Sequence, residues 1–300
     1  MMELLVDARN ILGEGILWNE RSGRLFWTDI EASELWSCDA DGGSLRRWPL
    51  PERLCSMALT ARDERLLLGL ASGLALFNLD DGRLERLHLV EADLPGTRIN
   101  DGRVDRQGRF VFGMFNQAED PKHPVGGFYR LNRDFSLERL ALGGAAIANS
   151  ICFSPDGATM YYADSATGEI RCCDYAPGAS SGAGAVSNPR QFAAADAAPG
   201  GPDGSTVDAE GYLWNTRWGA GLVVRFAPNG SIERTLALAA PQPTCPAFGG
   251  PGLDVLYLTS ATVGLADAAL AAAPDSGGVF SCRLGVRGLP EQRFGVLTDA

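Results

Sequence analysis

Six positions of the sequence carry an oxygen-bearing side chain at the same distance from the end of a predicted β-strand. Counting back four residues from the strand ends at Trp18, Val104, Phe153 and Val207 gives Glu14, Asn100, Asn149 and Asp203. The same count in two further segments gives Ser56 and Thr244. Carboxylate, amide and hydroxyl oxygens that recur at one position of a repeated unit can converge on a common ligand.

The two carboxylates of this set, Glu14 and Asp203, indicate what that ligand could be. Two anionic groups held close together repel unless one is protonated or a cation lies between them. We expect a cation. An all-oxygen ligand set suits Ca²⁺, Mg²⁺ or Mn²⁺, and Zn²⁺ and Fe²⁺ are also compatible. Three protein ligands leave positions open for water and substrate, which is typical of a catalytic metal site. The alternative is that these side chains only cap strand starts and turns.

The elements that must position these side chains form an internal repeat. The turns within the predicted inner hairpins are marked by Gly23, Glu64, Gly108, Gly157, Gly211 and Gly252, at intervals of 41, 44, 49, 54 and 41 residues. Such intervals are typical of four-stranded β-propeller blades. The sequence therefore predicts an all-β protein, a single six-bladed β-propeller domain over residues 1–300. The central metal site is expected where the innermost strands of the blades meet.

Four segments stand apart from this repeat. The opening strand around Leu4–Val6 is expected to complete the last blade. The segment 176–201, rich in Ala, Gly, Ser and Pro, predicts a long surface excursion. The polar loop 116–127 either overhangs the end of the propeller or is a solvated connector. The segment 265–273 predicts one short helix, because it consists largely of Ala and Leu.

Composition excludes several classes of protein. A net charge of −11 argues against nucleic acid as a partner, because binders of nucleic acid carry basic patches that neutralise phosphates. No apolar run reaches the roughly 18 residues that span a bilayer, so we expect no membrane partner. The N-terminus lacks the pattern of a secretory signal, which favours a cytoplasmic location. Seven cysteines without a CxxC motif predict reduced thiols in the core rather than disulfides.

The motifs around the candidate ligands resemble those of a known family. They are Gly13-Glu14-Gly15, Arg98-Ile99-Asn100-Asp101-Gly102, Asn149 with Ser154-Pro155-Asp156-Gly157, and Pro202-Asp203-Gly204. The ordered set resembles the gluconolactonases, regucalcin (senescence marker protein) and luciferin-regenerating enzyme. That resemblance implies a six-bladed propeller with one divalent metal cation held by Glu14, Asn149 and Asp203. It also implies that Arg98 and Asn100 contact the substrate.

The resemblance implies a carboxylic-ester hydrolase that converts a sugar lactone to its aldonic acid. Asp203 would act both as metal ligand and as proton acceptor from the attacking water. The preferred substrate is a pentonolactone such as L-arabinonolactone or xylonolactone, with gluconolactone next. Two positions depart from the family pattern. A frequent proline is replaced by Ile16, and a substrate-binding Glu has only Gln117 and Glu119 as candidates, of which we favour Glu119.

Two other functions remain open from the sequence. An oxygen-ligated metal could equally polarise a phosphoryl group, as in a phosphotriesterase or aryl esterase. The protein could also be a non-catalytic calcium-binding or interaction propeller. In the favoured interpretation the only partner is a small-molecule sugar lactone. We expect a monomer, because a closed propeller leaves few free strand edges.

Overall fold

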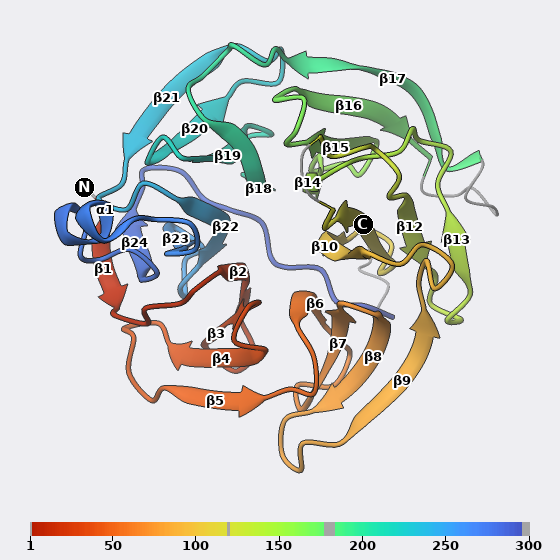
Figure 1. Cartoon of the computed structure of the whole chain (residues 1–300), viewed down its shortest axis with the longest axis horizontal. Coiled ribbons are helices and arrows are strands. Elements are labelled where there is room, and N and C mark those ends of the chain that lie inside the picture. Colours follow the sequence, from red (N-terminus) through yellow and green to blue (C-terminus); the bar gives the residue numbers. More distant parts are fainter. Residues whose placement is uncertain (1, 119–120, 177–183, 296–300) are drawn as a thin grey trace. The chain divides into compact units, whose positions relative to one another are not determined.

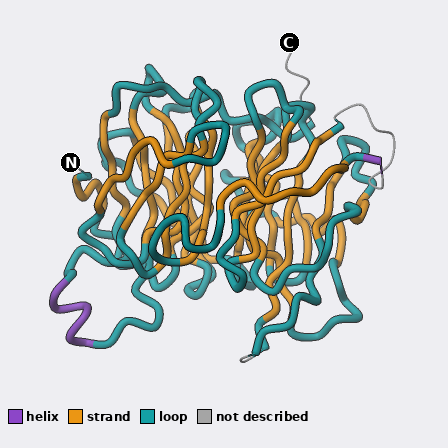
Figure 2. The backbone as a smooth tube through the Cα atoms, turned by 90° about the horizontal axis from the view of Figure 1, so that it is seen from above, coloured by secondary structure: helices purple, strands orange, loops and turns teal. Residues whose placement is uncertain are grey.

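The computed structural model describes residues 2–118, 121–176 and 184–295 of the 300-residue chain. β-Strands dominate these ranges and form six four-stranded sheets (Figures 1 and 2). Strands that follow one another along the chain pair as antiparallel hairpins, for example β2 with β3 and β3 with β4. Six sheets of four strands match the predicted repeat in both number and content. By its internal contacts the chain divides into two compact units of three sheets each.

Unit 1 contains residues 1–54 and 196–290. Its first sheet has the order β1-β24-β23-β22 and consists of β1 (Glu3–Val6), β24 (Val279–Arg283), β23 (Val255–Ser260) and β22 (Pro243–Gly249). The second consists of β2 (Gly13–Asn19), β3 (Arg24–Asp29), β4 (Glu34–Asp39) and β5 (Arg46–Pro49). The third consists of β18 (Gly201–Val207), β19 (Leu213–Trp218), β20 (Leu222–Phe226) and β21 (Ile232–Ala237).

Unit 2 contains residues 55–195 and the segment that starts at 291. Its first sheet consists of β6 (Leu54–Leu59), β7 (Arg65–Leu70), β8 (Gly73–Asn78) and β9 (Leu84–Leu89). The second consists of β10 (Thr97–Val104), β11 (Phe110–Asn116), β12 (Phe128–Leu131) and β13 (Leu137–Arg139). The third consists of β14 (Ala148–Phe153), β15 (Thr159–Asp164), β16 (Ile170–Tyr175) and β17 (Val186–Ala193).

The burial pattern explains why the sequence forms these sheets. The second strand of a sheet is covered on both faces, so β3 and β7 each carry a run of large apolar side chains, Leu25–Trp27 and Leu66–Leu68, and are buried from their second residue onward. The outermost strands face solvent on one side, and β9 and β21 accordingly each carry an adjacent Glu and Arg and leave most of their residues partly or fully exposed. Aromatic rings fill the spaces between sheets, as in the stacked pair Trp18 and Tyr257, whose ring centroids lie 6.2 Å apart. Burial of such rings supplies much of the stabilisation.

Two predictions about the flanking segments are confirmed. β1 pairs with β24, with Glu3 opposite Ser281 and Leu4 opposite Phe280, so the N-terminal strand completes the sheet that the C-terminal strands begin. The short helix is α1 (Asp267–Ala272), which buries none of its residues. Among the described residues, no helix has the length and apolar character needed to cross a bilayer.

The prediction of a long surface excursion over residues 176–201 is wrong in part. Residues 177–183 lie outside the described part of the chain, but the following residues form β17, the fourth strand of its sheet. This strand escaped prediction because it is an outer strand with mostly exposed polar side chains, and only its ends, Val186 and Ala193, are buried. Its pairing with β16 also contains two register shifts, which interrupt the alternation of polar and apolar residues.

All seven cysteines are free thiols, and six of them are buried. Burial raises the pKa of the Cys38 and Cys173 thiols to about 12, so both remain protonated at neutral pH. These cysteines therefore act as small apolar side chains of the core.

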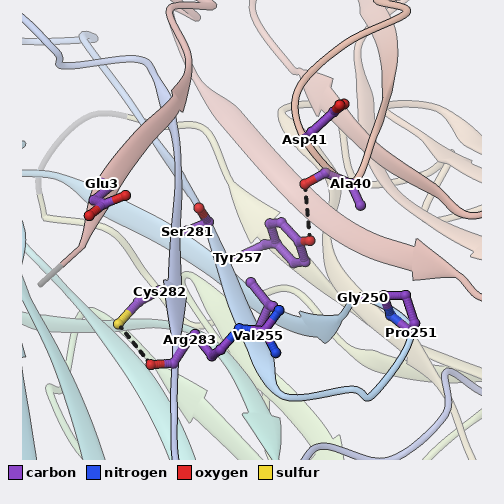
Figure 3. A pocket seen from close by; sticks show the side chains of 10 residues that line it. All are labelled: Glu3, Ala40, Asp41, Gly250, Pro251, Val255, Tyr257, Ser281, Cys282 and Arg283. Carbon is purple, nitrogen blue, oxygen red and sulfur yellow. Dashed lines mark hydrogen bonds between the residues drawn. The ribbon is translucent and has the colours of Figure 1, made fainter.

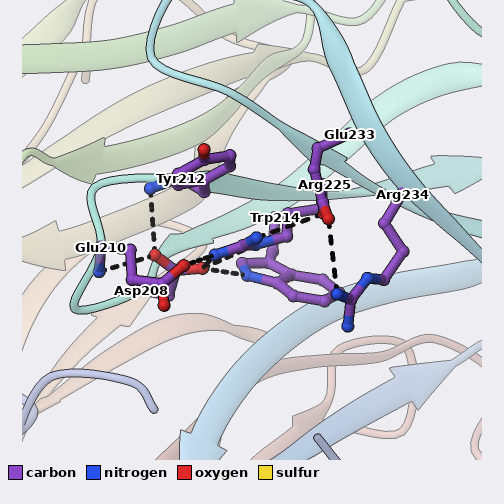
Figure 4. A network of polar contacts seen from close by, with 7 residues as sticks. All are labelled: Asp208, Glu210, Tyr212, Trp214, Arg225, Glu233 and Arg234. Carbon is purple, nitrogen blue, oxygen red and sulfur yellow. Dashed lines mark hydrogen bonds and ion pairs between the residues drawn. The ribbon is translucent and has the colours of Figure 1, made fainter. Parts of the chain in front are cut away.

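A buried carboxylate organises the inner turn of the sheet β18–β21 (Figure 4). One oxygen of Asp208 accepts the backbone N–H groups of Glu210 and Tyr212, at 2.9 and 3.0 Å. The other accepts Nε1 of Trp214 at 2.9 Å and two nitrogens of Arg225 at 2.8 and 2.7 Å. Both Asp208 and Arg225 are almost inaccessible to solvent, so each compensates for the buried charge of the other.

Replacement of Asp208 by Ala should therefore lower the free energy of unfolding by about 3–5 kcal/mol, because it removes the one fully buried carboxylate that pairs with the Arg225 guanidinium among the described residues. Glu210 provides a matched control. It also forms an ion pair with Arg225, but its side chain is 56% exposed. Glu210→Ala should change the free energy of unfolding by less than about 1 kcal/mol. Urea denaturation measures both, and equal effects of the two substitutions would contradict this account.

Candidate functional site

A β-bulge interrupts one strand in at least five of the six sheets, at the positions where the sequence predicts functional side chains. It lies in the strand that starts each series of hairpins, here called the first strand, which is β22 in the sheet that β1 completes. The register shifts occur in β2, β10, β14, β18 and β22. At each shift two residues of the first strand lie opposite a single residue of the second strand. A bulge of this kind bends the strand and redirects a side chain out of the regular ladder. The candidate ligands therefore lie where the backbone departs from ideal strand geometry.

The predicted single position of the repeat is in fact two neighbouring positions. Glu14 and Asn149 are the last paired residues before their bulges, opposite Thr28 and Ala163. Asn100 and Asp203 are instead the first residues inside their bulges. Counting from the strand ends could not distinguish the two positions, because the count assumes that every strand has the same local geometry.

Backbone conformation separates these two kinds of bulge. The residues after Glu14 and Asn149 have left-handed conformations, with φ of 60° at Gly15 and 61° at Ser150. Glycine adopts this conformation without steric cost, whereas a buried serine there is strained. Ser150 is completely buried. Strain of this kind concentrates at functional sites, where the surrounding structure holds it in place.

In unit 2 the structure brings three predicted site residues into direct contact. Nδ2 of Asn100 donates to Oδ1 of Asn149 at 3.1 Å and to the carbonyl oxygen of Ala148 at 2.8 Å. A guanidinium nitrogen of Arg98 donates to Oδ1 of Asn100 at 2.6 Å. Arg98 is buried, and its guanidinium lies 4.4 Å from the ring centroid of Phe115. Arg98, Asn100 and Asn149 thus form one connected polar group.

Two further residues support this group, and sequence reasoning missed both. Oδ2 of Asp101 accepts the backbone N–H of Ile151 at 2.7 Å, so β10 holds the bulge of β14 on both sides of Asn149. Burial of the carboxyl raises the pKa of Asp101, although the Ile151 N–H and the charge of Arg103 act in the opposite direction. Ser165 follows β15 and accepts Nδ2 of Asn149 at 2.8 Å. Asp101 lies within a motif that the sequence did show, but Ser165 carried no signal.

In unit 1 the structure places Glu14 directly before one bulge and Asp203 within another, and the two bulges are tied together through β22. The Thr216 hydroxyl donates to the carbonyl oxygens of Gly204 and Thr244, at 3.0 and 2.5 Å. The Thr244 hydroxyl donates to the carbonyl oxygen of Gly13 at 2.5 Å. The backbone beside Asp203 is thereby connected, through two threonines, to the backbone beside Glu14. A Cβ atom on Gly204 would lie only 2.8 Å from the backbone of β22, so this position requires glycine.

The two carboxylates differ in exposure. Asp203 is 7% exposed, whereas Glu14 is partly exposed and its Oε2 accepts the N–H of Gly15 at 2.9 Å. The two hydroxyl residues of the predicted set, Thr244 and Ser56, lie within the sheets. The hydroxyl of Thr244 is engaged within unit 1, and Ser56 is buried in β6. Glu119, the predicted substrate-binding carboxylate, lies outside the described residues.

The donor atoms of the candidate ligands are of the type that a hard divalent cation prefers. Their donors are carboxylate oxygens at Glu14 and Asp203 and an amide oxygen at Asn149. Oδ1 of Asn149 accepts one hydrogen bond, from Asn100, which leaves its second lone pair for a ligand. Within the described ranges no three His, Cys, Asp or Glu side chains are arranged so that they alone could hold a metal ion. The fit therefore concerns the type of donor atom that each unit offers: two carboxylates in unit 1 and one amide in unit 2.

Two surface cavities lie away from these residues. One, of about 510 Å³, opens beside β23 and β24 in unit 1, where Tyr257 donates to the carbonyl oxygen of Ala40 at 3.2 Å (Figure 3). Burial raises the pKa of Tyr257 to about 12. The other, of about 500 Å³, lies in unit 2 and is lined in part by Asp164 and Lys122. Of the predicted site residues that lie within the described ranges, none lines either cavity.

Comparison with known proteins identifies the family. The chain belongs to the SMP-30/gluconolactonase/LRE-like family, whose model matches residues 12–262. It is 52% identical over 291 residues to an L-arabinolactonase of Azospirillum brasilense, which covers 97% of this chain and 94% of that protein. The predicted resemblance is confirmed.

Solved structures support the same assignment. A calcium-binding regucalcin of Agrobacterium tumefaciens matches with a TM-score of 0.90 and 31% identity, covering 98% of this chain and 97% of that chain. A luciferin-regenerating enzyme matches with a TM-score of 0.88 and 26% identity, covering 99% of both chains. Together with the six four-stranded sheets, the regucalcin match confirms the predicted all-β six-bladed β-propeller.

Proposed function

We propose that the protein is a sugar lactonase, a carboxylic-ester hydrolase that opens an aldonolactone to its aldonic acid. The observation that carries this proposal is the 52% identity to an L-arabinolactonase over nearly the full length of both chains. The hydrogen-bonded group of Arg98, Asn100 and Asn149 supports the proposal, because it holds two proposed substrate-binding side chains next to Asn149, a candidate metal ligand. The preferred substrate is a pentonolactone, L-arabinonolactone first and xylonolactone next, with gluconolactone as the hexose alternative.

The proposed cofactor is one divalent cation, held by Glu14, Asn149 and Asp203. When bound, it supplies Lewis acidity to the lactone carbonyl and to water. Ca²⁺, Mn²⁺, Zn²⁺ and Fe²⁺ are all candidates, because each accepts carboxylate and amide oxygens. Support comes from the oxygen donors at the bulges and from the free lone pair of Asn149.

The chain's own residues perform the remaining steps. The Asp203 carboxylate accepts a proton from water as the water oxygen bonds to the carbonyl carbon of the lactone. As the bond between that carbon and the ring oxygen breaks, Asp203 returns the proton to the ring oxygen, which becomes the hydroxyl of the open acid. Arg98 and Asn100 hold the substrate hydroxyls, and such hydrogen bonds discriminate strongly between sugars. Glu119 remains the proposed additional contact to the substrate.

Other features of the proposal follow from the sequence. A single domain over residues 1–300, a cytoplasmic location and a monomeric state remain predictions, as do the absence of nucleic-acid and membrane partners. The two alternatives, a phosphotriesterase and a non-catalytic calcium-binding propeller, differ from a lactonase in the substrates that they hydrolyse. Acid release from a panel of substrates therefore separates the three functions.

Acid release from a panel of substrates tests the proposed activity. The protein should release acid from L-arabinonolactone, xylonolactone and gluconolactone, fastest from the pentonolactones, and should show little hydrolysis of paraoxon or phenyl acetate. EDTA should reduce the rate to that of spontaneous hydrolysis, and added Mn²⁺ or Zn²⁺ should restore it. Preferential hydrolysis of paraoxon would favour the phosphotriesterase, and a panel without any enzymatic acid release would leave only a binding propeller.

Asp203→Ala should lower kcat for lactone hydrolysis by about 10²–10⁴-fold, because it removes the proton acceptor. The protein should remain folded, as judged by circular dichroism. Asp196→Ala is the matched control, since Asp196 is an exposed carboxylate shortly before the same strand. It should retain the wild-type rate. Wild-type turnover by a folded Asp203→Ala variant would refute the role assigned to this residue.

A further inference from the structure

Four side chains of unit 2 form a continuous series of hydrogen bonds, here called the amide relay. Arg98 donates to Oδ1 of Asn100 at 2.6 Å, and Nδ2 of Asn100 donates to Oδ1 of Asn149 at 3.1 Å. Nδ2 of Asn149 then donates to the hydroxyl oxygen of Ser165 at 2.8 Å. The relay thus runs from a residue proposed to bind substrate, through a proposed metal ligand, to a serine that has no assigned role.

The direction of the relay follows from the chemistry of its ends. A guanidinium group can only donate hydrogen bonds, so the atom of Asn100 that faces Arg98 must be its oxygen. The NH₂ group of Asn100 therefore faces Asn149, whose own oxygen must accept. That orientation leaves the NH₂ group of Asn149 toward Ser165, and a hydroxyl oxygen can accept from it. Both amides are consequently fixed in one of their two possible orientations.

The backbone around Ser165 holds its hydroxyl in place. The Ser165 N–H donates to the carbonyl oxygen of Ile147 at 3.0 Å. The carboxylate of the preceding residue, Asp164, accepts the N–H groups of Ala146 and Ile147 at 2.8 and 3.0 Å. The end of β15 is thereby fastened to the segment that leads into β14 and Asn149. Ser165 is partly buried, so its side chain can be changed without opening a cavity in the core.

We propose that Ser165 is a positioning residue for the metal site: its hydroxyl holds the Asn149 amide so that Oδ1, and not the NH₂ group, is presented to the cation. This inference rests on the proposed role of Asn149 as a metal ligand. Without the hydroxyl, Nδ2 of Asn149 loses its acceptor, and the orientation of the amide depends on Asn100 alone. An amide that rotates by half a turn offers an NH₂ group, which cannot ligate a cation.

Calorimetric titration of metal-free protein with Mn²⁺ tests the proposal without relying on activity. Ser165→Ala should raise the Kd for Mn²⁺ by about tenfold, which is the lower end of the usual effect of residues that orient metal ligands. Ser165→Thr keeps the hydroxyl and should bind Mn²⁺ like the wild type. Thr167→Ala is the matched control, because the Thr167 hydroxyl donates to the backbone of Asp164 at 2.9 Å, outside the relay. It should leave the Kd unchanged.

Kinetics and a second variant separate positioning from general damage. In Ser165→Ala the lactonase kcat should return to the wild-type value at saturating Mn²⁺, because only metal affinity is impaired. In an Asn149→Ala background, Ser165→Ala should produce no further loss of Mn²⁺ affinity, since the group that it orients is gone. An additional loss of similar size in that background would overturn the proposal.

The outcomes also distinguish this inference from the proposed function. If wild-type protein binds no Mn²⁺, or if Asn149→Ala binds it as well as the wild type, the metal site itself is wrong. If the wild type binds Mn²⁺, Asn149→Ala binds it more weakly and Ser165→Ala binds it normally, the metal site stands and the role of Ser165 is refuted.

Discussion

The candidate site depends on one constraint: the first strand of a sheet must leave the regular ladder at, or directly after, the residue that carries a functional side chain. Bulges in β2, β14 and β18 meet this requirement at Glu14, Asn149 and Asp203. A regular strand directs successive side chains to opposite faces of its sheet, where neighbouring sheets cover them. A bulge changes that direction locally, at the cost of ladder hydrogen bonds and, at Ser150, of backbone strain.

The side chains around the bulges compensate for those costs. In unit 2, Asp101 accepts the free N–H of Ile151, and Asn100 donates to the carbonyl oxygen of Ala148. In unit 1, threonine hydroxyls from Thr216 and Thr244 satisfy carbonyl groups of the bulges and connect adjacent sheets. The same residues therefore satisfy buried backbone groups and hold the strands that carry the proposed ligands. A substitution in this region is expected to change stability and metal affinity together, unless it acts at a partly exposed end such as Ser165.

Sequence reasoning predicted the fold because blade length is a periodic property. The spacing of the inner turns survives loops of different length, so six blades, the closing strand β1 and the short helix α1 were all accessible. The outer strand β17 was not, because its polar, exposed sequence resembles a surface loop. An outer strand that packs against a single neighbouring strand needs few apolar residues, so its amino-acid composition differs little from that of a loop.

The site was predictable in residue type but not in local geometry. Glu14, Asn100, Asn149 and Asp203 were found from their chemistry and spacing, and the structure places all four at bulges. Their division into two positions depends on left-handed conformations at Gly15 and Ser150, which spacing does not encode. Ser165 was missed because a serine after a strand is common, and only its contact with Asn149 distinguishes it.

The central claim is that Glu14, Asn149 and Asp203 bind one divalent cation together. Anomalous X-ray diffraction from crystals grown with Mn²⁺ tests this claim most directly. The account predicts a single strong peak at roughly 2.0–2.6 Å from a carboxylate oxygen of Glu14, Oδ1 of Asn149 and a carboxylate oxygen of Asp203. A crystal of active protein with no peak at these three residues, or with its peak elsewhere, would contradict it.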